Sequence, residues 1–88
     1  MYKIEFHKKA LKDIQKLKQR SLEIKAKQLV DIIKENPFQI PPPYEKLVGD
    51  LSGLYSRRIN IQHRLVYEVI EDKKLIRVLS LWSHYDNV

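Results

Sequence analysis

The 88-residue sequence predicts an α+β fold in which a helical hairpin covers one face of a mainly antiparallel sheet of four to five strands. Three observations support this fold class. Residues 2–6 alternate apolar and polar side chains, residues 8–35 repeat apolar side chains at helical spacing, and residues 45–82 return to strand-like runs. Because no repeat, low-complexity segment or second unit is visible, we expect one domain, 1–88.

The alternation over residues 2–6 predicts a first strand, and the helical period begins at Lys8. We expect Ser21 to cap a second helix, which Asn36-Pro37 ends. The apolar stripes of the two helices are expected to meet in one seam. The first stripe contains Ala10, Leu11, Ile14 and Leu17, and the second contains Leu22, Ala26, Leu29, Val30 and Ile33.

Three consecutive prolines, Pro41 to Pro43, exclude a helix or a central strand and favour a stiff extended connector. A short edge strand is expected at residues 45–48, followed by a β-hairpin that ends at Ile70. The most apolar run, residues 75–82, fits a central strand. The predicted order is therefore one strand, two helices and four strands.

The hairpin contains three arginines, which are difficult to bury in so small a protein. If the chain reverses around Ile61, Arg58 pairs with Arg64 on one face of the sheet. Paired like charges repel, so we expect an anion, most simply a phosphate, to compensate them. A two-residue loop would instead separate the pair. The same face would carry Ser56, Val66 and Glu68.

The opposite face of the hairpin is mostly apolar and suits a core. Arg57 falls on this face, where we expect it to pair with an acid or to bind a partner protein. His63 is interpreted as structural. The aromatic residues Tyr55, Tyr67 and Trp82 are interpreted as packing rather than as platforms for nucleic-acid bases.

The chain has 17 basic and 11 acidic side chains, a formal net charge of +6, which favours nucleic acid or acidic proteins as partners. Most of this charge lies in the predicted helices. The absence of cysteine excludes disulfides and thiolate zinc sites. With no apolar run near the ~20 residues of a membrane span and no signal-peptide pattern, we expect a soluble cytoplasmic protein that does not contact membranes.

No phosphate-binding loop, dinucleotide turn, paired metal-binding histidines or Ser-His-Asp arrangement is present, so the sequence predicts neither a cofactor nor a metal. The informative polar residues lie in or at the ends of predicted strands, which a sheet can bring together. They are Glu45, Arg58, Arg64, His84 and Tyr85.

Four segments that contain these residues resemble the YoeB/Txe branch of the RelE superfamily, the toxins of bacterial type II toxin–antitoxin modules. The segments are Glu45-x-Leu47, Leu51–Ile59, His63–Tyr67 and His84-Tyr85. The resemblance implies a ribosome-dependent mRNA endonuclease that a cognate antitoxin neutralises, with the ribosome and mRNA as further partners. By position, it implies Glu45 as general base, His84 as general acid, Arg58 and Arg64 as phosphate ligands, and Tyr85 as a residue that orients the substrate base.

The chemistry of RNA cleavage agrees with these residue types. A base must take the 2′-hydroxyl proton, cations must stabilise the charged phosphorus centre, and an acid must protonate the departing 5′-oxygen. Two other classes of function remain open at this point. One is a non-catalytic toxin of the same fold that inhibits an enzyme such as gyrase. The other is a plain RNA-binding or partner-binding module, in which Glu45 would be an ordinary solvated carboxylate.

Overall fold

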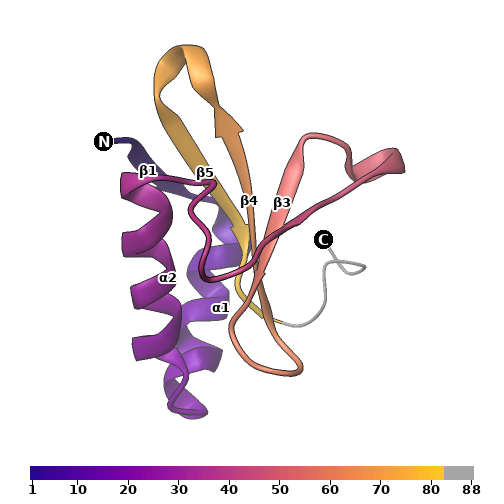
Figure 1. Cartoon of the computed structure of the whole chain (residues 1–88). Helices are drawn as coiled ribbons and strands as arrows, with labels where there is room; N and C mark the ends of the chain where they lie inside the picture. Colours follow the sequence, from indigo (N-terminus) through magenta and orange to yellow (C-terminus); the bar gives the residue numbers. More distant parts are fainter. Residues whose placement is uncertain (83–88) are drawn as a thin grey trace.

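Two helices lie on one face of a five-stranded sheet in the computed structural model, which describes residues 1–82 (Figure 1). The predicted α+β class and the predicted order of elements are both confirmed. The strands and helices are β1 (Lys3–Phe6), α1 (Lys8–Gln19), α2 (Glu23–Glu35), β2 (Glu45–Lys46), β3 (Leu54–Arg58), β4 (Arg64–Ile70) and β5 (Leu75–Ser80).

The sheet has the strand order β1-β5-β4-β3-β2, so β5 is an inner strand, as its apolar composition predicted. The pairs β2–β3, β3–β4 and β4–β5 are antiparallel, whereas β1 pairs with β5 in parallel. Ile76 and Val78 of β5 are buried and belong to the core that the sheet shares with the helices. None of the described helices is both long enough and apolar enough to cross a bilayer.

The β3–β4 hairpin reverses around Ile61, as predicted, and Arg58 pairs with Arg64. The side chain of Asn60 organises the loop, because its Oδ1 accepts hydrogen bonds from the backbone N–H groups of Gln62 (2.9 Å) and His63 (2.7 Å). Asparagine is favoured in turns for this reason. The loop is longer than two residues, so the arginine pair keeps its register.

The prediction that Ser21 caps the second helix is wrong. Ser21 adopts a left-handed backbone (φ 57°) and closes the end of α1 instead. Its N–H donates to the carbonyl of Lys18, and the N–H of Leu22 donates to the carbonyl of Leu17, the pattern of a Schellman motif. The residue before α2 is Leu22, which makes no side-chain capping bond. The turn between the helices is therefore stabilised by the C-terminal cap of α1 and not by an N-terminal cap of α2.

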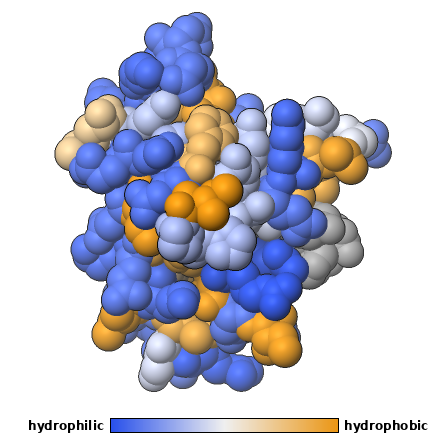
Figure 2. Space-filling view, in the orientation of Figure 1, coloured by the Kyte–Doolittle hydropathy of each residue, from blue (hydrophilic) through white to orange (hydrophobic). Residues whose placement is uncertain are grey.

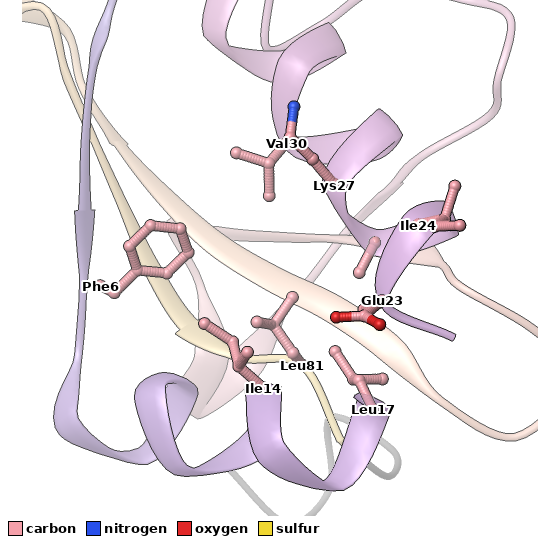
Figure 3. A pocket seen from close by; sticks show the side chains of 9 residues that line it. Phe6, Ile14, Leu17, Glu23, Ile24, Lys27, Val30 and Leu81 are labelled. Carbon is pink, nitrogen blue, oxygen red and sulfur yellow. The ribbon is translucent and has the colours of Figure 1, made fainter. Parts of the chain in front are cut away.

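The apolar stripes of α1 and α2 face the sheet, where Leu17, Leu29 and Ile33 are buried. They do not form one continuous seam, because a groove of about 350 Å³ opens between the helices. Figure 3 shows Phe6 from β1 and Ile14 from α1 at this groove, opposite Val30 of α2. The predicted single seam is thus correct only in part.

The proline-containing connector is bent around the side chain of Arg57, so the prediction of an extended segment is wrong. Arg57 is only 1% exposed, and its guanidinium donates to the backbone carbonyls of Pro42 (2.6 Å), Gln39 (2.9 Å) and Pro37 (3.0 Å). Its Nε donates to the hydroxyl of Tyr67 (3.1 Å), which in turn donates to the Pro37 carbonyl (2.7 Å). The expected acid or partner protein is therefore replaced by carbonyl oxygens of the same chain.

Burial raises the pKa of the Tyr67 phenol above its usual value, and the neighbouring Arg57 cation offsets part of this effect. The phenol therefore stays protonated and keeps its donor role at any physiological pH. The Tyr67 ring packs on that of Tyr55, with the centroids 5.8 Å apart. The rings of Phe38, Tyr44 and Tyr55 in turn pack against one another, with centroids 5.2 to 5.9 Å apart.

His63 is buried and stacks on Trp82, with the ring centroids 3.9 Å apart, which supports its interpretation as structural. Burial lowers the pKa of His63, the nearby Arg20 cation lowers it further, and the Asp13 carboxylate opposes the shift. Asp13 is itself buried, and it accepts hydrogen bonds from the N–H of Leu81 (3.0 Å) and from the Lys9 ammonium (3.3 Å). This contact joins α1 to the chain that follows β5.

We expect Arg57→Met to lower the free energy of unfolding by about 3 kcal/mol or more, because three carbonyls and one phenol would lose their donor in a buried site. The exposed neighbour provides the matched control. Arg58→Met should change the free energy of unfolding by about 0.5 kcal/mol or less. Urea unfolding of both variants measures the difference, and equal effects would contradict the structural role of Arg57.

We expect the His63 imidazole to titrate below 6.5 in an NMR experiment, because burial disfavours its charged form. An imidazole with a depressed pKa in the folded state contributes full stability above pH 6.5. That contribution falls as pH drops from 6.5 through the folded-state value. The loss of stability between pH 7.5 and 5.5 should therefore be smaller in His63→Phe than in the unaltered protein. A folded-state pKa at or above 6.5 would contradict this prediction.

Candidate active site

Glu45 is the first residue of β2, a two-residue edge strand that follows directly after the bent connector. The register of the β2–β3 ladder places it opposite Ser56. The residue before it, Tyr44, has its ring 5.1 Å from the guanidinium carbon of Arg57. The buried Arg57 therefore fixes the connector at Pro42 and contacts Tyr44, and in this way it sets the position of Glu45.

Arg58 and Arg64 come from the end of β3 and the start of β4, where the ladder pairs them directly. Arg58 is exposed, whereas the side chain of Arg64 is 15% exposed. The Nη1 atom of Arg64 lies 3.5 Å from Oε1 of Glu45, whose side chain is 51% exposed. Part of the charge compensation that we expected from an outside anion is thus supplied by Glu45. Two guanidinium groups and one carboxylate still leave a net positive charge.

These three residues line one cleft of about 410 Å³, together with Pro43, Tyr44 and Ser56. The structure thus brings together Glu45, Arg58 and Arg64, which the sequence singled out. The other two candidates, His84 and Tyr85, lie outside the described residues. Guanidinium groups bind phosphate oxygens through two parallel hydrogen bonds, and a carboxylate next to them can accept a proton. The chemistry of this cleft suits a phosphodiester.

Three residues of this cleft, Pro43, Tyr44 and Ser56, are not among the candidates that the sequence indicates. Of these, Ser56 is predicted on the arginine face, but the sequence assigns it no role. Its side chain is buried, and its Oγ has no hydrogen-bond partner within the described part of the chain. The available signal was its position two residues before Arg58, which puts both side chains on one face of the strand.

The groove between the helices has a different character. Its lining is mostly aliphatic and aromatic, with Glu23 and Lys27 as the polar members, and Figure 3 shows both side chains extending from α2. Ile24, which also borders the groove, is 70% exposed. Elsewhere the side of the molecule drawn in Figure 2 is mostly hydrophilic, with separate hydrophobic patches. The groove therefore suits an apolar side chain of a partner better than it suits chemistry.

Comparison with known proteins finds relatives that match about two thirds of the chain or less. Toxin YoeB of Synechocystis sp. (strain ATCC 27184 / PCC 6803 / Kazusa) is 44% identical over 57 residues, which cover 65% of this chain and 64% of the relative. Toxin YoeB of Escherichia coli (strain K12) is 42% identical over 52 residues, which cover 59% and 62%. Each of these alignments therefore spans less than two thirds of the relative's own length.

Solved structures with the same fold cover nearly all of the chain. The YoeB/ParE toxin from Agrobacterium tumefaciens has a TM-score of 0.85 and 28% identity, covering 94% of this chain and 99% of that one. A chain of the YoeB-YefM complex from Staphylococcus aureus has a TM-score of 0.79 and 34% identity, covering 97% and 99%.

The family model described as "YoeB-like toxin of bacterial type II toxin-antitoxin system" matches residues 6–85. This match contains every element from α1 to β5 and all five candidate site residues. The chain therefore belongs to the YoeB-like toxins of bacterial type II toxin–antitoxin systems.

Proposed function

We propose that this protein is an endoribonuclease that cleaves mRNA in the decoding site of the ribosome and so inhibits translation. The observation that carries the proposal is the cleft in which Glu45, Arg58 and Arg64 meet. Membership of a toxin family supports it, and so does the formal net charge of +6, which favours approach to RNA.

In the proposed mechanism Glu45 takes the proton from the 2′-hydroxyl, which then attacks the adjacent phosphorus. Arg58 and Arg64 hold the non-bridging oxygens and stabilise the added negative charge. His84 protonates the departing 5′-oxygen, and Tyr85 orients the substrate base. The products are a 2′,3′-cyclic phosphate, or a 3′-phosphate after its hydrolysis, and a 5′-hydroxyl.

The ion pair between Arg64 and Glu45 has a consequence for this mechanism. At 3.5 Å, and with Glu45 half exposed, the contact is open to competition from a stronger ligand. A phosphodiester that occupies Arg64 through two hydrogen bonds releases the carboxylate of Glu45. Substrate binding thus frees the Glu45 carboxylate next to the bound phosphodiester, where it is needed to accept the 2′-hydroxyl proton.

We expect Glu45→Gln to reduce mRNA cleavage on programmed ribosomes by 10²- to 10⁴-fold, because the amide cannot accept the 2′-hydroxyl proton. Arg64→Ala and His84→Ala should also reduce cleavage strongly. The matched control is Glu35→Gln, which changes an exposed carboxylate at the end of α2, distant in sequence from the cleft. The measurement is the single-turnover rate constant, with end-group analysis for the cyclic phosphate.

Undiminished cleavage in all three site variants would end the catalytic assignment. Intact mRNA together with inhibited DNA supercoiling would instead favour a non-catalytic toxin that binds an enzyme such as gyrase. Binding of mRNA without any new 5′-hydroxyl end would favour a plain RNA-binding module.

We also propose that an acidic antitoxin covers the helices of this protein and inserts an apolar side chain into the groove between α1 and α2. The relative from Staphylococcus aureus was solved as a YoeB-YefM complex, which supports a protein partner of this kind. The helices carry most of the positive charge, and the groove between them is apolar. A partly disordered acidic segment that folds on binding would match both features.

We expect Ile24→Glu to weaken binding of the cognate antitoxin at least ten-fold, because it adds a negative charge at the rim of the groove and removes apolar surface. The matched control is Ile40→Glu, since Ile40 is also 70% exposed but lies in the connector. Calorimetric titration gives both dissociation constants. Equal weakening by the two variants would place the antitoxin elsewhere.

A further inference from the structure

Ser56 is a buried polar residue whose hydroxyl has no partner within residues 1–82, although the residue lines the candidate active site. It is 1% exposed and lies on β3, directly opposite Glu45. Buried polar side chains in native proteins nearly always form hydrogen bonds, so a hydroxyl without one calls for an explanation.

The sheet register shows which functional group can use this hydroxyl. A row of paired residues crosses the sheet from β2 to β5 in the order Glu45, Ser56, Val66, Ser80. Directly paired residues in antiparallel strands have Cβ atoms about 4.5 to 5.5 Å apart and lie on the same face. Within this row, Glu45 is therefore the one ionisable neighbour of Ser56.

Glu45 needs such a donor once substrate binds. In the free protein its carboxylate contacts Arg64 at 3.5 Å, and a substrate phosphate would compete for that guanidinium. A carboxylate released in this way is half exposed and has several rotamers available. One hydrogen bond from a fixed hydroxyl would hold it in place and favour its ionised form.

We propose that Ser56 is a positioning residue for the general base, donating a hydrogen bond to the Glu45 carboxylate when the substrate phosphodiester occupies Arg64. This inference rests on the proposed nuclease function and deepens it. No bond is made or broken at Ser56. The residue acts through Glu45 and keeps that carboxylate ionised and directed at the 2′-hydroxyl.

Ser80 provides a matched control within the same row. It is also 1% exposed, and its hydroxyl likewise lacks a partner among the described residues. It pairs with Val66, and it is absent from the described lining of the cleft that contains the Glu45 carboxylate. Replacing either serine by alanine removes a buried hydroxyl without a partner, which should leave the free energy of unfolding unchanged or slightly higher.

The experiment compares Ser56→Ala and Ser80→Ala with the unaltered protein in single-turnover cleavage of mRNA on saturating ribosomes, from pH 5.5 to 8.5. We expect Ser56→Ala to lower the maximal rate constant roughly ten-fold, with ribosome binding unchanged. The acidic limb of its pH–rate profile should move to higher pH, because the carboxylate is harder to keep ionised without the donor. Ser80→Ala should match the unaltered protein in both respects.

Two results would overturn the inference while leaving the nuclease proposal intact. One is a Ser56→Ala profile that coincides with that of the unaltered protein. The other is an equal rate loss in both variants without movement of the acidic limb, which would indicate packing. If the unaltered protein failed to cleave mRNA at all, the nuclease proposal would fall and the role of Ser56 would fall with it.

Discussion

The structure depends on one buried cation that is satisfied by the chain itself. The guanidinium of Arg57 binds three backbone carbonyls between Pro37 and Pro42 as well as the hydroxyl of Tyr67. A charge buried to this degree is costly unless its donors are paired. The cost is offset here because the connector carries carbonyl oxygens that need donors in any case. One side chain of β3 therefore determines how the chain passes from α2 to the edge strand that begins with Glu45.

Much of the fold follows from periodicity in the sequence. The change from a period of two to a helical period and back predicted the two α-helices and the strands β1, β3, β4 and β5, because each of these elements buries one face against the same core. The errors occurred where local preference competed with another partner. Serine is a residue type that often caps the start of a helix. Ser21 instead adopts the left-handed backbone conformation that closes the end of α1. Consecutive prolines favour extension in isolation, but the Arg57 guanidinium binds the carbonyls of Pro37, Gln39 and Pro42 and so bends the connector.

Part of the candidate site could also be predicted from the sequence. The pairing of Arg58 with Arg64 followed from the position of the turn, because strand geometry leaves little freedom once the reversal is fixed. The proximity of Glu45 to that pair came from family resemblance, since a two-residue strand after a bent connector gives almost no periodic signal. The alternation of the strand separated Arg57, on the apolar face, from Arg58 on the opposite face. It could not show that the partners of Arg57 are backbone carbonyls of the connector, because those oxygens come from a segment with no periodic pattern.

The place of β5 in the sheet has a consequence for how the protein is made. β5 is the last of the described strands to be synthesised, yet it lies between β1 and β4 and provides hydrogen-bond partners for both. Among these strands β1 pairs only with β5, in the register that sets Lys3 opposite Leu75. A nascent chain that stops before β5 therefore leaves β1 unpaired, one edge of β4 open and the core incomplete. The complete five-stranded sheet that supports the cleft can therefore form only after residues 75–80 have left the ribosomal exit tunnel.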